Sequence, residues 1–286
     1  MRIWKGASEM QHDKILAYRR WLENREYSAA TIEKYTRTLG RFFRETGAQE
    51  HPVKEVVAAW RDSLVQKGYS ASGVNAMLAA VNGYQEFCGM PQNKVKPLKC
   101  QRKVFCDAER ELDKGEYFRL LNAARQSRKK RILLILQTIC STGIRVSELK
   151  YITAEAVNKR RASIRCKGKC REILLPGELC KRLSRWCARR RIRSGPVFTT
   201  RNGKPVDRSN VWKEMKALCK QAGVAWKKVF PHNLRHLFAR TFYQLDRDLS
   251  KLADVLGHSS IETTRLYIME SGAQHEKLLN RMHLLL

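Results

Sequence analysis

Four side chains that could carry out chemistry lie within 36 residues near the end of the chain: His232, Arg235, His258 and Tyr267. Arginine suits phosphate because its planar guanidinium stays charged and donates paired hydrogen bonds. Histidine exchanges protons near neutral pH, and tyrosine can act as a covalent nucleophile once it loses its proton. Because no carboxylate cluster accompanies them, the set indicates phosphoryl transfer without a metal ion.

His232 and Arg235 are three residues apart at the expected start of a helix. They therefore share one face near the positive end of the helix dipole, which favours a bound anion. His236 adds a second histidine at the spacing that some zinc sites use, but the required glutamate is replaced by Asn233. We expect no metal here and interpret His236 as a packed helix residue. His258 follows Gly257, which lets the chain turn sharply.

Two further cationic groups lie upstream. Arg145 follows a glycine that we expect to end a helix, and Glu148 comes one turn later, where it can orient the guanidinium. Lys167 lies between two short stretches, 162–166 and 173–175, that predict a β-hairpin. A lysine at a hairpin tip can give a proton to a leaving oxygen. Lys169 is equally basic and two residues away, so the choice between the two lysines stays open.

In order and spacing, these groups resemble the motifs of the tyrosine recombinases, the family of phage integrases and Xer-type recombinases. The pattern His-x-x-Arg, then Leu-Gly-His, then a tyrosine nine positions later is similar to the end of that family's catalytic domain. The stretch 141–149 is similar to its first-arginine box, and 165–172 to the hairpin that carries its catalytic lysine. Any one of these motifs would be weak evidence, but their conjunction is specific.

The resemblance implies roles for these residues. Tyr267 would attack the scissile phosphate, Arg145 and Arg235 would stabilise the growing charge, and Lys167 would protonate the departing 5′-oxygen. His232 and His258 would bond to the phosphate or assist proton movement. The product would be a 3′-phosphotyrosine that another strand's 5′-hydroxyl can reverse, with neither a metal nor another cofactor.

Composition points to a polyanionic partner. The 286 residues include 57 Lys and Arg against 27 Asp and Glu, a formal charge of +30, which favours nucleic acid. No apolar run approaches the length of a membrane span, and the first residues do not resemble a signal peptide, so we expect a cytoplasmic, prokaryotic protein without membrane contact. The nine cysteines are expected to be reduced, and the Cys166–Cys170 pair alone is poor evidence for zinc.

Hydrophobic spacing before residue 90 predicts four helices, over 12–24, 29–46, 53–67 and 71–88. This resembles the family's SAM-like core-binding domain. Residues that could lie on a DNA backbone there are Thr31, Lys34, Tyr35, Arg37 and Arg41. A basic linker would add phosphate contacts through Lys94, Lys96, Lys99, Arg102 and Lys103.

We therefore expect three segments: a helical domain over 1–89, a linker over 90–107 and a catalytic domain over 108–286. The fold class is mainly α with a small β-hairpin, and the resemblance implies a C-shaped clamp around duplex DNA. Helices are expected in the catalytic domain over 178–193, 209–221, 234–245, 249–256 and 261–268, among others.

The last residues, 277–286, are rich in leucine. In the resembling family the C-terminal segment docks onto a neighbouring protomer, which implies a homotetramer acting on two duplexes. The expected function is site-specific recombination, in integration, excision or Xer-like resolution. The alternatives are strand cleavage and religation like that of a type IB topoisomerase, a non-catalytic DNA-binding protein, and a basic protein that binds RNA or a membrane surface.

Overall fold

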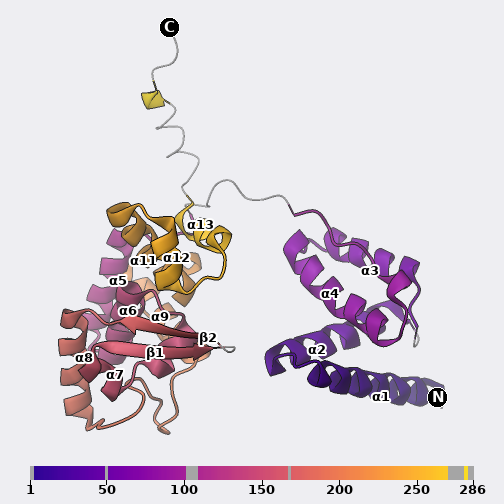
Figure 1. Ribbon diagram of the computed structural model, residues 1–286, viewed down its shortest axis with the longest axis horizontal. Coiled ribbons are helices and arrows are strands. Elements are labelled where there is room, and N and C mark those ends of the chain that lie inside the picture. Colours follow the sequence, from indigo (N-terminus) through magenta and orange to yellow (C-terminus); the bar gives the residue numbers. More distant parts are fainter. Residues whose placement is uncertain (1–2, 49–50, 101–108, 167–168, 270–279, 283–286) are drawn as a thin grey trace. The chain divides into compact units, whose positions relative to one another are not determined.

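The computed structural model describes residues 3–48, 51–100, 109–166, 169–269 and 280–282. The chain divides into two compact units, Met1–Arg102 and Lys103–Leu286 (Figure 1). Helices make up most of both units, and the described strands form one two-stranded antiparallel sheet in the second. The predicted fold class, mainly α with a small hairpin, is confirmed.

The described part of the first unit contains four α-helices, as its hydrophobic spacing predicts, but the first begins at Ile3, nine residues before the predicted start at 12. Ser28 and Ser70 cap two of them by accepting hydrogen bonds from backbone N–H groups of the first turn. The apolar faces meet in a core in which the Tyr18 and Tyr84 rings pack edge to face at 5.5 Å. The helices are α1 (Ile3–Asn24), α2 (Ala29–Thr46), α3 (Lys54–Gln66) and α4 (Ala71–Phe87).

The chain that follows α4 stays attached to the first unit after a short turn, η1 (Pro91–Asn93). Asn82 donates to the carbonyl of Val95 and accepts from its N–H, at 2.9 and 3.0 Å. Asn75 holds Leu98 in the same way, at 2.8 and 2.7 Å. The two asparagine side chains thereby satisfy backbone N–H and carbonyl groups that an extended segment would otherwise pair with a neighbouring strand. The stretch predicted as a linker from residue 90 therefore packs on the first unit at least as far as Leu98.

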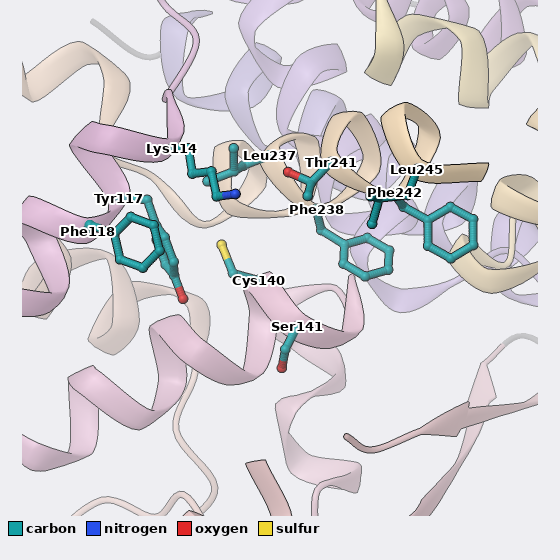
Figure 2. A pocket seen from close by; sticks show the side chains of 10 residues that line it. All are labelled: Lys114, Tyr117, Phe118, Cys140, Ser141, Leu237, Phe238, Thr241, Phe242 and Leu245. Carbon is teal, nitrogen blue, oxygen red and sulfur yellow. The ribbon is translucent and has the colours of Figure 1, made fainter. Parts of the chain in front are cut away.

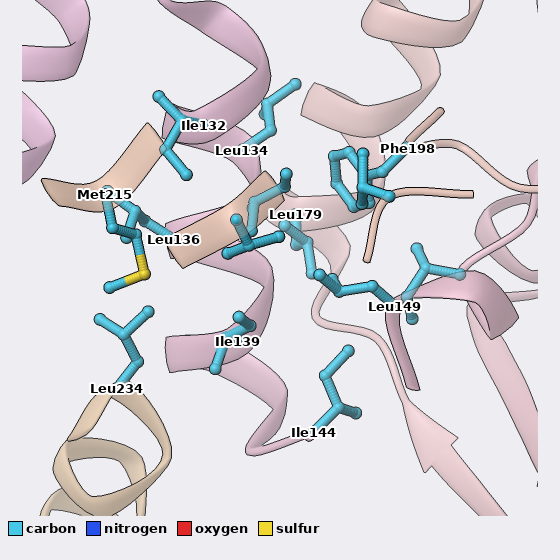
Figure 3. Packing of buried hydrophobic residues seen from close by; sticks show 14 of the residues in the cluster. Ile132, Leu134, Leu136, Ile139, Ile144, Leu149, Leu179, Phe198, Met215 and Leu234 are labelled. Atoms are coloured by element: carbon cyan, nitrogen blue, oxygen red, sulfur yellow. The ribbon is translucent and has the colours of Figure 1, made fainter. Parts of the chain in front are cut away.

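The second unit is built around α6 (Lys130–Thr142), whose side chains are buried on most sides (Figure 3). A capping box between Asp113 and Glu116 starts the preceding helix, and Gly143 ends α6 in the left-handed conformation. The other elements are α5 (Lys114–Gln126), η2 (Val146–Tyr151), α7 (Ala154–Lys159), α8 (Gly177–Arg190), α9 (Arg208–Lys216), α10 (Cys219–Ala222) and η3 (Trp226–Lys228).

The predicted hairpin is present as β1 (Arg161–Cys166) and β2 (Lys169–Leu174). Cys166 pairs with Lys169, so the connection is residues 167–168, which lie outside the described part of the chain. Lys169 therefore belongs to strand β2, where it pairs with Cys166 as the first residue after the tip. The predicted second strand began at 173, four residues too late.

Three helices of the second unit pack together over one end of α6: α11 (Pro231–Asp246), α12 (Leu249–Leu256) and α13 (Ile261–Ile268). In Figure 1 they form the upper part of the second unit. Helix α11 begins at Pro231, earlier than the predicted 234, because proline is well suited to a first helical turn. His232 is thereby fixed on the helix rather than in the loop before it.

Candidate active site

Arg235 is a buried cation at the centre of the site. Its side chain is 1 % exposed. Nη1 donates to the carbonyl of Gly143 at 2.5 Å, and Nη2 to that of Leu256 at 2.6 Å. Its Nε has no hydrogen-bond partner, and no carboxylate lies within ion-pair distance, among the described residues. Burial, and then the charge of Arg145, lowers the pKa of Arg235 to about 10. Because burying an unpaired charge costs free energy, a buried cation of this kind favours the binding of an anion.

A second group of charges is organised by Glu148, whose side chain is 5 % exposed. It accepts from the backbone N–H of Arg145 at 2.7 Å and from that residue's guanidinium at 3.1 Å. Its other partner is Arg171 on β2, at 2.7 Å. Glu148 therefore orients Arg145, which stays half-exposed, and is shared by the two arginines Arg145 and Arg171. The site has a net charge of +2, counting Arg235.

Arg171 was not among the predicted site residues. Its Nη1 also donates to the carbonyl of Val255, at 3.0 Å, and so ties the hairpin to the end of α12. It approaches Gly257 so closely that a Cβ added there would lie 2.5 Å from the arginine side chain. The available sequence signal was its place in the stretch 165–172, which resembles the family's lysine-carrying hairpin.

Tyr267 lies among three histidines. Its ring centroid is 4.4 Å from that of His236, 4.8 Å from His258 and 5.2 Å from His232. The guanidinium carbon of Arg235 is 5.7 Å from the same ring. The tyrosine is 8 % exposed. Arg145, Glu148, His232, Arg235, His258 and Tyr267 are thus brought into one site, whereas Lys167 lies outside the described residues.

The tautomer of His258 follows from its partners. Its Nε2 lies 2.9 Å from Nη2 of Arg235, which can only donate, so Nε2 must accept. Nδ1 therefore carries the proton and donates to Oγ1 of Thr264 on α13, at 2.9 Å. Burial and the neighbouring arginine charges lower the pKa of His258 to about 4. Desolvation of its packed side, with His236 and the arginines, lowers the pKa of His232 to about 4 as well.

These shifts predict how stability depends on pH. In the unfolded chain both imidazoles take up a proton near pH 6.5, whereas in the folded chain they stay neutral to about pH 4. The free energy of unfolding should therefore fall as the pH is lowered from about 6.5 towards 4. Urea titrations of wild-type protein and His258→Gln at several pH values test this. The variant should lose less stability over that range, and His12→Gln on α1 should match wild type.

The other predicted DNA contacts differ in how accessible they are. Lys34, Arg37, Lys96 and Lys99 are exposed and form no ion pair within the described chain. Arg41 instead bonds to Glu45 at 2.9 Å and to the Tyr69 hydroxyl at 3.1 Å. The remaining predicted contacts have these surroundings: Thr31 bonds to Ser28, Tyr35 packs on Tyr27, Lys94 pairs with Glu86, and Arg102 and Lys103 lie outside the described residues.

A membrane-spanning segment is not found: across the described residues, no helix combines the required length and apolarity.

Comparison with known proteins agrees with this geometry. Residues 110–273 match the phage integrase family, and residues 15–88 match the N-terminal SAM-like domain of phage integrases. The tyrosine recombinase XerA of Pyrococcus furiosus is 28 % identical over 272 residues, 93 % of this chain and 92 % of that protein. The tyrosine recombinase XerD of Halalkalibacterium halodurans is 26 % identical over 276 residues, 85 % and 88 % of the two chains.

Solved structures share the fold. A lambda integrase dimer bound to a COC′ core site superposes with a TM-score of 0.71 at 16 % identity, covering 91 % of this chain and 96 % of that one. The XerH recombinase bound to its difH substrate gives 0.66 at 20 % identity, covering 87 % and 78 %. The family match spans more than half of the sequence, including every described residue of the site. The chain therefore belongs to the phage integrase family, the tyrosine recombinases.

Proposed function

We propose that the chain cuts and rejoins DNA strands at a specific site, with Tyr267 as the nucleophile. The observation that carries this role is the buried Arg235, whose charge has no carboxylate partner in the described chain and whose guanidinium lies 5.7 Å from the tyrosine ring. A phosphodiester is the anion that would compensate it. We place the activity in the cytoplasm of a prokaryotic cell, where the DNA is.

The proposed step balances without added reagents. The Tyr267 oxygen bonds to the scissile phosphorus as its proton passes to a neutral imidazole of the site, His232 or His258, and the bond to the 5′-oxygen breaks. Arg145 and Arg235 stabilise the negative charge that develops on the phosphate oxygens. Lys167, or Lys169, gives the departing oxygen a proton. Attack by a 5′-hydroxyl on the phosphotyrosine reverses each of these changes and rejoins a strand.

A nicked duplex tests this proposal. Cleavage next to the nick releases a short oligonucleotide, which leaves the covalent complex without its rejoining partner. Wild-type protein incubated with such duplexes, made from the ends of the DNA element that encodes it, should form an adduct that survives denaturation. Mass spectrometry of the digested adduct should find the nucleotide on the peptide that contains Tyr267. Attachment to any other peptide would contradict the assignment.

Topoisomerase-like relaxation is the less favoured alternative, because the relatives that match 85 % and 93 % of the chain are named tyrosine recombinases. The two activities differ in which strands are rejoined. We expect strand exchange between two labelled duplexes that carry the site. Relaxation of supercoiled plasmid without exchange would favour the alternative.

We further propose a homotetramer on two duplexes, in which the leucine-rich tail of one protomer packs on its neighbour. Lambda integrase has been solved as a tetramer bound to a Holliday junction. Of the tail, 277–286, residues 277–279 and 283–286 lie outside the described part of the chain. A suitable receiving surface is an apolar groove of about 300 Å³ between α5, α6 and α11 (Figure 2). Its rim includes Phe118, 51 % exposed, and Leu245, 84 % exposed.

A charge in this groove should weaken assembly. In Leu245→Lys, or in a chain cut after residue 276, we expect cooperativity between protomers on a two-site duplex to fall at least about tenfold, roughly 1.4 kcal/mol. Single-site affinity should stay within about twofold. Gel shifts against protein concentration measure both quantities. Val65→Lys, an exposed apolar residue of α3, is the matched control. Unchanged cooperativity in both altered chains would exclude this groove.

A further inference from the structure

A dense run of cations covers α8 and the turn after it. Residues 181–193 contain seven Lys and Arg and no Asp or Glu. All seven are exposed, and only Lys181 pairs with an acid in the described chain, Glu178 at 2.9 Å. The opposite face of α8 is buried through Leu179, Leu183 and Cys187. The helix therefore presents a charged face to solvent from Lys181 to Arg190.

A polar hollow of about 330 Å³ adjoins this face, lined by Arg131, Arg190 and Arg201 with two threonines. Arg131 is fixed in place by the carbonyl of Thr199 at 2.7 Å and by Glu214 at 2.5 Å. Arg190 lies over the Trp186 ring at 5.0 Å, and Arg201 is exposed. The hollow thus combines one held guanidinium with two that face solvent, which suits a phosphate group.

The hollow is distinct from the candidate active site. Arg131 lies in the first turn of α6, whereas Gly143, which holds Arg235, lies just beyond its last turn. A helix of 13 residues separates the two places by about 20 Å. One phosphate cannot occupy both.

The helix dipole accounts for only some of the seven cations in residues 181–193. Cations in the last turn of a helix are favourable, which covers Arg189 and Arg190. Arg182 and Arg185 lie in the middle of the helix, where like charges three and four residues apart repel. A polyanion along the helix would relieve that repulsion. We propose that the charged face of α8 and the adjoining hollow bind the phosphate backbone of duplex DNA outside the stretch held at Tyr267.

Duplex length and salt test this surface. The variant Arg182→Gln/Arg185→Gln/Arg189→Gln would be compared with wild type on random-sequence duplexes of about 25 and 60 base pairs. On the long duplex, the slope of log K against log salt should be shallower in the variant by roughly 2 to 3, since each lost phosphate contact removes about 0.9. On the short duplex the two proteins should agree.

The control Arg125→Gln/Lys213→Gln/Lys220→Gln removes the same charge from other exposed positions of the unit. It should keep the wild-type slope on both duplexes. If the slope of log K against log salt changed equally in the two triple variants, the effect would be one of net charge in general, and the proposal would be overturned. It would also be overturned if the Arg182/Arg185/Arg189 variant had the wild-type slope on the long duplex. Neither result depends on which residue is the nucleophile.

A second inference rests on a different observation, the surroundings of His236. Its ring is nearer to Tyr267 than either other imidazole, and its Nδ1 lies 3.2 Å from Oε1 of Glu111. Arg240 binds the other oxygen of that carboxylate and donates to the carbonyl of Leu112 at 2.7 Å. Burial opposes ionisation, but His236 and Arg240 outweigh it and hold the pKa of Glu111 below its usual value. The carboxylate therefore accepts, and His236 Nδ1 donates.

We infer that Glu111 and His236 are positioning residues for Tyr267, an inference that rests on the proposed function. Of the three imidazoles around the tyrosine, His258 uses both nitrogens for Arg235 and Thr264, and His232 is exposed. His236 is held from one side by a carboxylate and contacts the tyrosine ring with the other. This arrangement fixes the ring that must present its oxygen to the phosphorus.

Single-turnover cleavage of the nicked duplex distinguishes a positioning role from a merely structural one. In Glu111→Gln and His236→Ala we expect the rate constant to fall at least about tenfold with DNA affinity within twofold, and His236→Phe should recover part of the rate by keeping the ring contact. A merely structural role would lower the amplitude, the fraction of competent protein, and leave the rate constant unchanged. That result would overturn the inference.

Glu109→Gln is the matched control, since Glu109 pairs with Lys227 at 2.8 Å only two residues away but is 78 % exposed. It should cleave at the wild-type rate. Absence of any adduct from wild-type protein would instead refute the proposed function itself, before the variants are compared.

Discussion

Replacing Tyr267 by phenylalanine is expected to lower the rate of covalent adduct formation at least roughly 10⁴-fold, because the reaction then lacks its nucleophile. Phenylalanine keeps the ring contacts with His232, His236 and His258, so the fold around it should persist. Binding to the uncleaved duplex should stay within about twofold. Denaturing gels of the nicked-duplex reaction measure the first quantity, and gel shifts measure the second.

Tyr243→Phe provides the control for this experiment. Tyr243 lies on α11 in the same unit, and its ring packs against the Arg247 guanidinium at 5.9 Å. It should form adduct at the wild-type rate. An adduct of undiminished yield in Tyr267→Phe would show that another residue attacks the phosphate, and the roles assigned to Arg235 and His258 would then also have to be reconsidered.

The second large effect is expected from Gly143→Ala. Gly143 has φ of +65°, and a Cβ there would lie 2.5 Å from the Phe238 ring. Left-handed backbone costs a non-glycine residue about 1–2 kcal/mol, and forcing a methyl into packed surroundings adds about 1–3 kcal/mol. We expect a loss of about 3 kcal/mol in the free energy of unfolding, measured by urea titration. Cleavage should suffer too, since the Gly143 carbonyl holds Arg235.

Substitutions at two other glycines of the same unit separate the backbone cost from the steric cost of the contact with Phe238. Gly223 has φ of +58° but open space where a Cβ would lie, so Gly223→Ala should show the backbone cost alone. Gly177 has neither a positive φ nor a neighbour within 4 Å, and Gly177→Ala should be neutral. If Gly143→Ala were no worse than Gly223→Ala, the contact with Phe238 would carry no energetic weight.

Local sequence signals predicted the helices of the first unit well. Their apolar faces repeat at helical spacing, and Ser28 and Ser70 occupy the capping positions that their chemistry favours, as Asp113 does in the second unit. The single helix predicted over 209–221 was wrong. It divides into α9 and α10 at Ala217–Leu218, where no glycine or proline marks the break. Burial of Leu218 and Cys219 in the core decides this turn, and such long-range packing is not visible in a local pattern.

The candidate site was predictable where its residues stand in ordered motifs. Arg145, Glu148, His232, Arg235, His258 and Tyr267 are recognisable because their order and spacing resemble the motifs of the family. The contact between Glu111 and His236 was not, because the two are 125 residues apart and only the fold brings them together. His236 was interpreted as a packed helix residue, but what it packs against is the tyrosine. The role of Lys167 stays a prediction.

The hydrogen bonds made by the chain on either side of residues 101–108 determine where a chimeric protein can be joined. Asn75 and Asn82 bind the chain up to Leu98, so those residues must travel with the first unit. The carbonyl of Arg110 is bound by Asn233, and Glu111 contacts His236, so the catalytic unit must keep its chain from Glu109 onward. A chimera that takes its DNA-binding unit from a relative should therefore be joined between these limits. A junction placed a few residues later, at the start of α5, would discard part of the active site together with the exchanged unit.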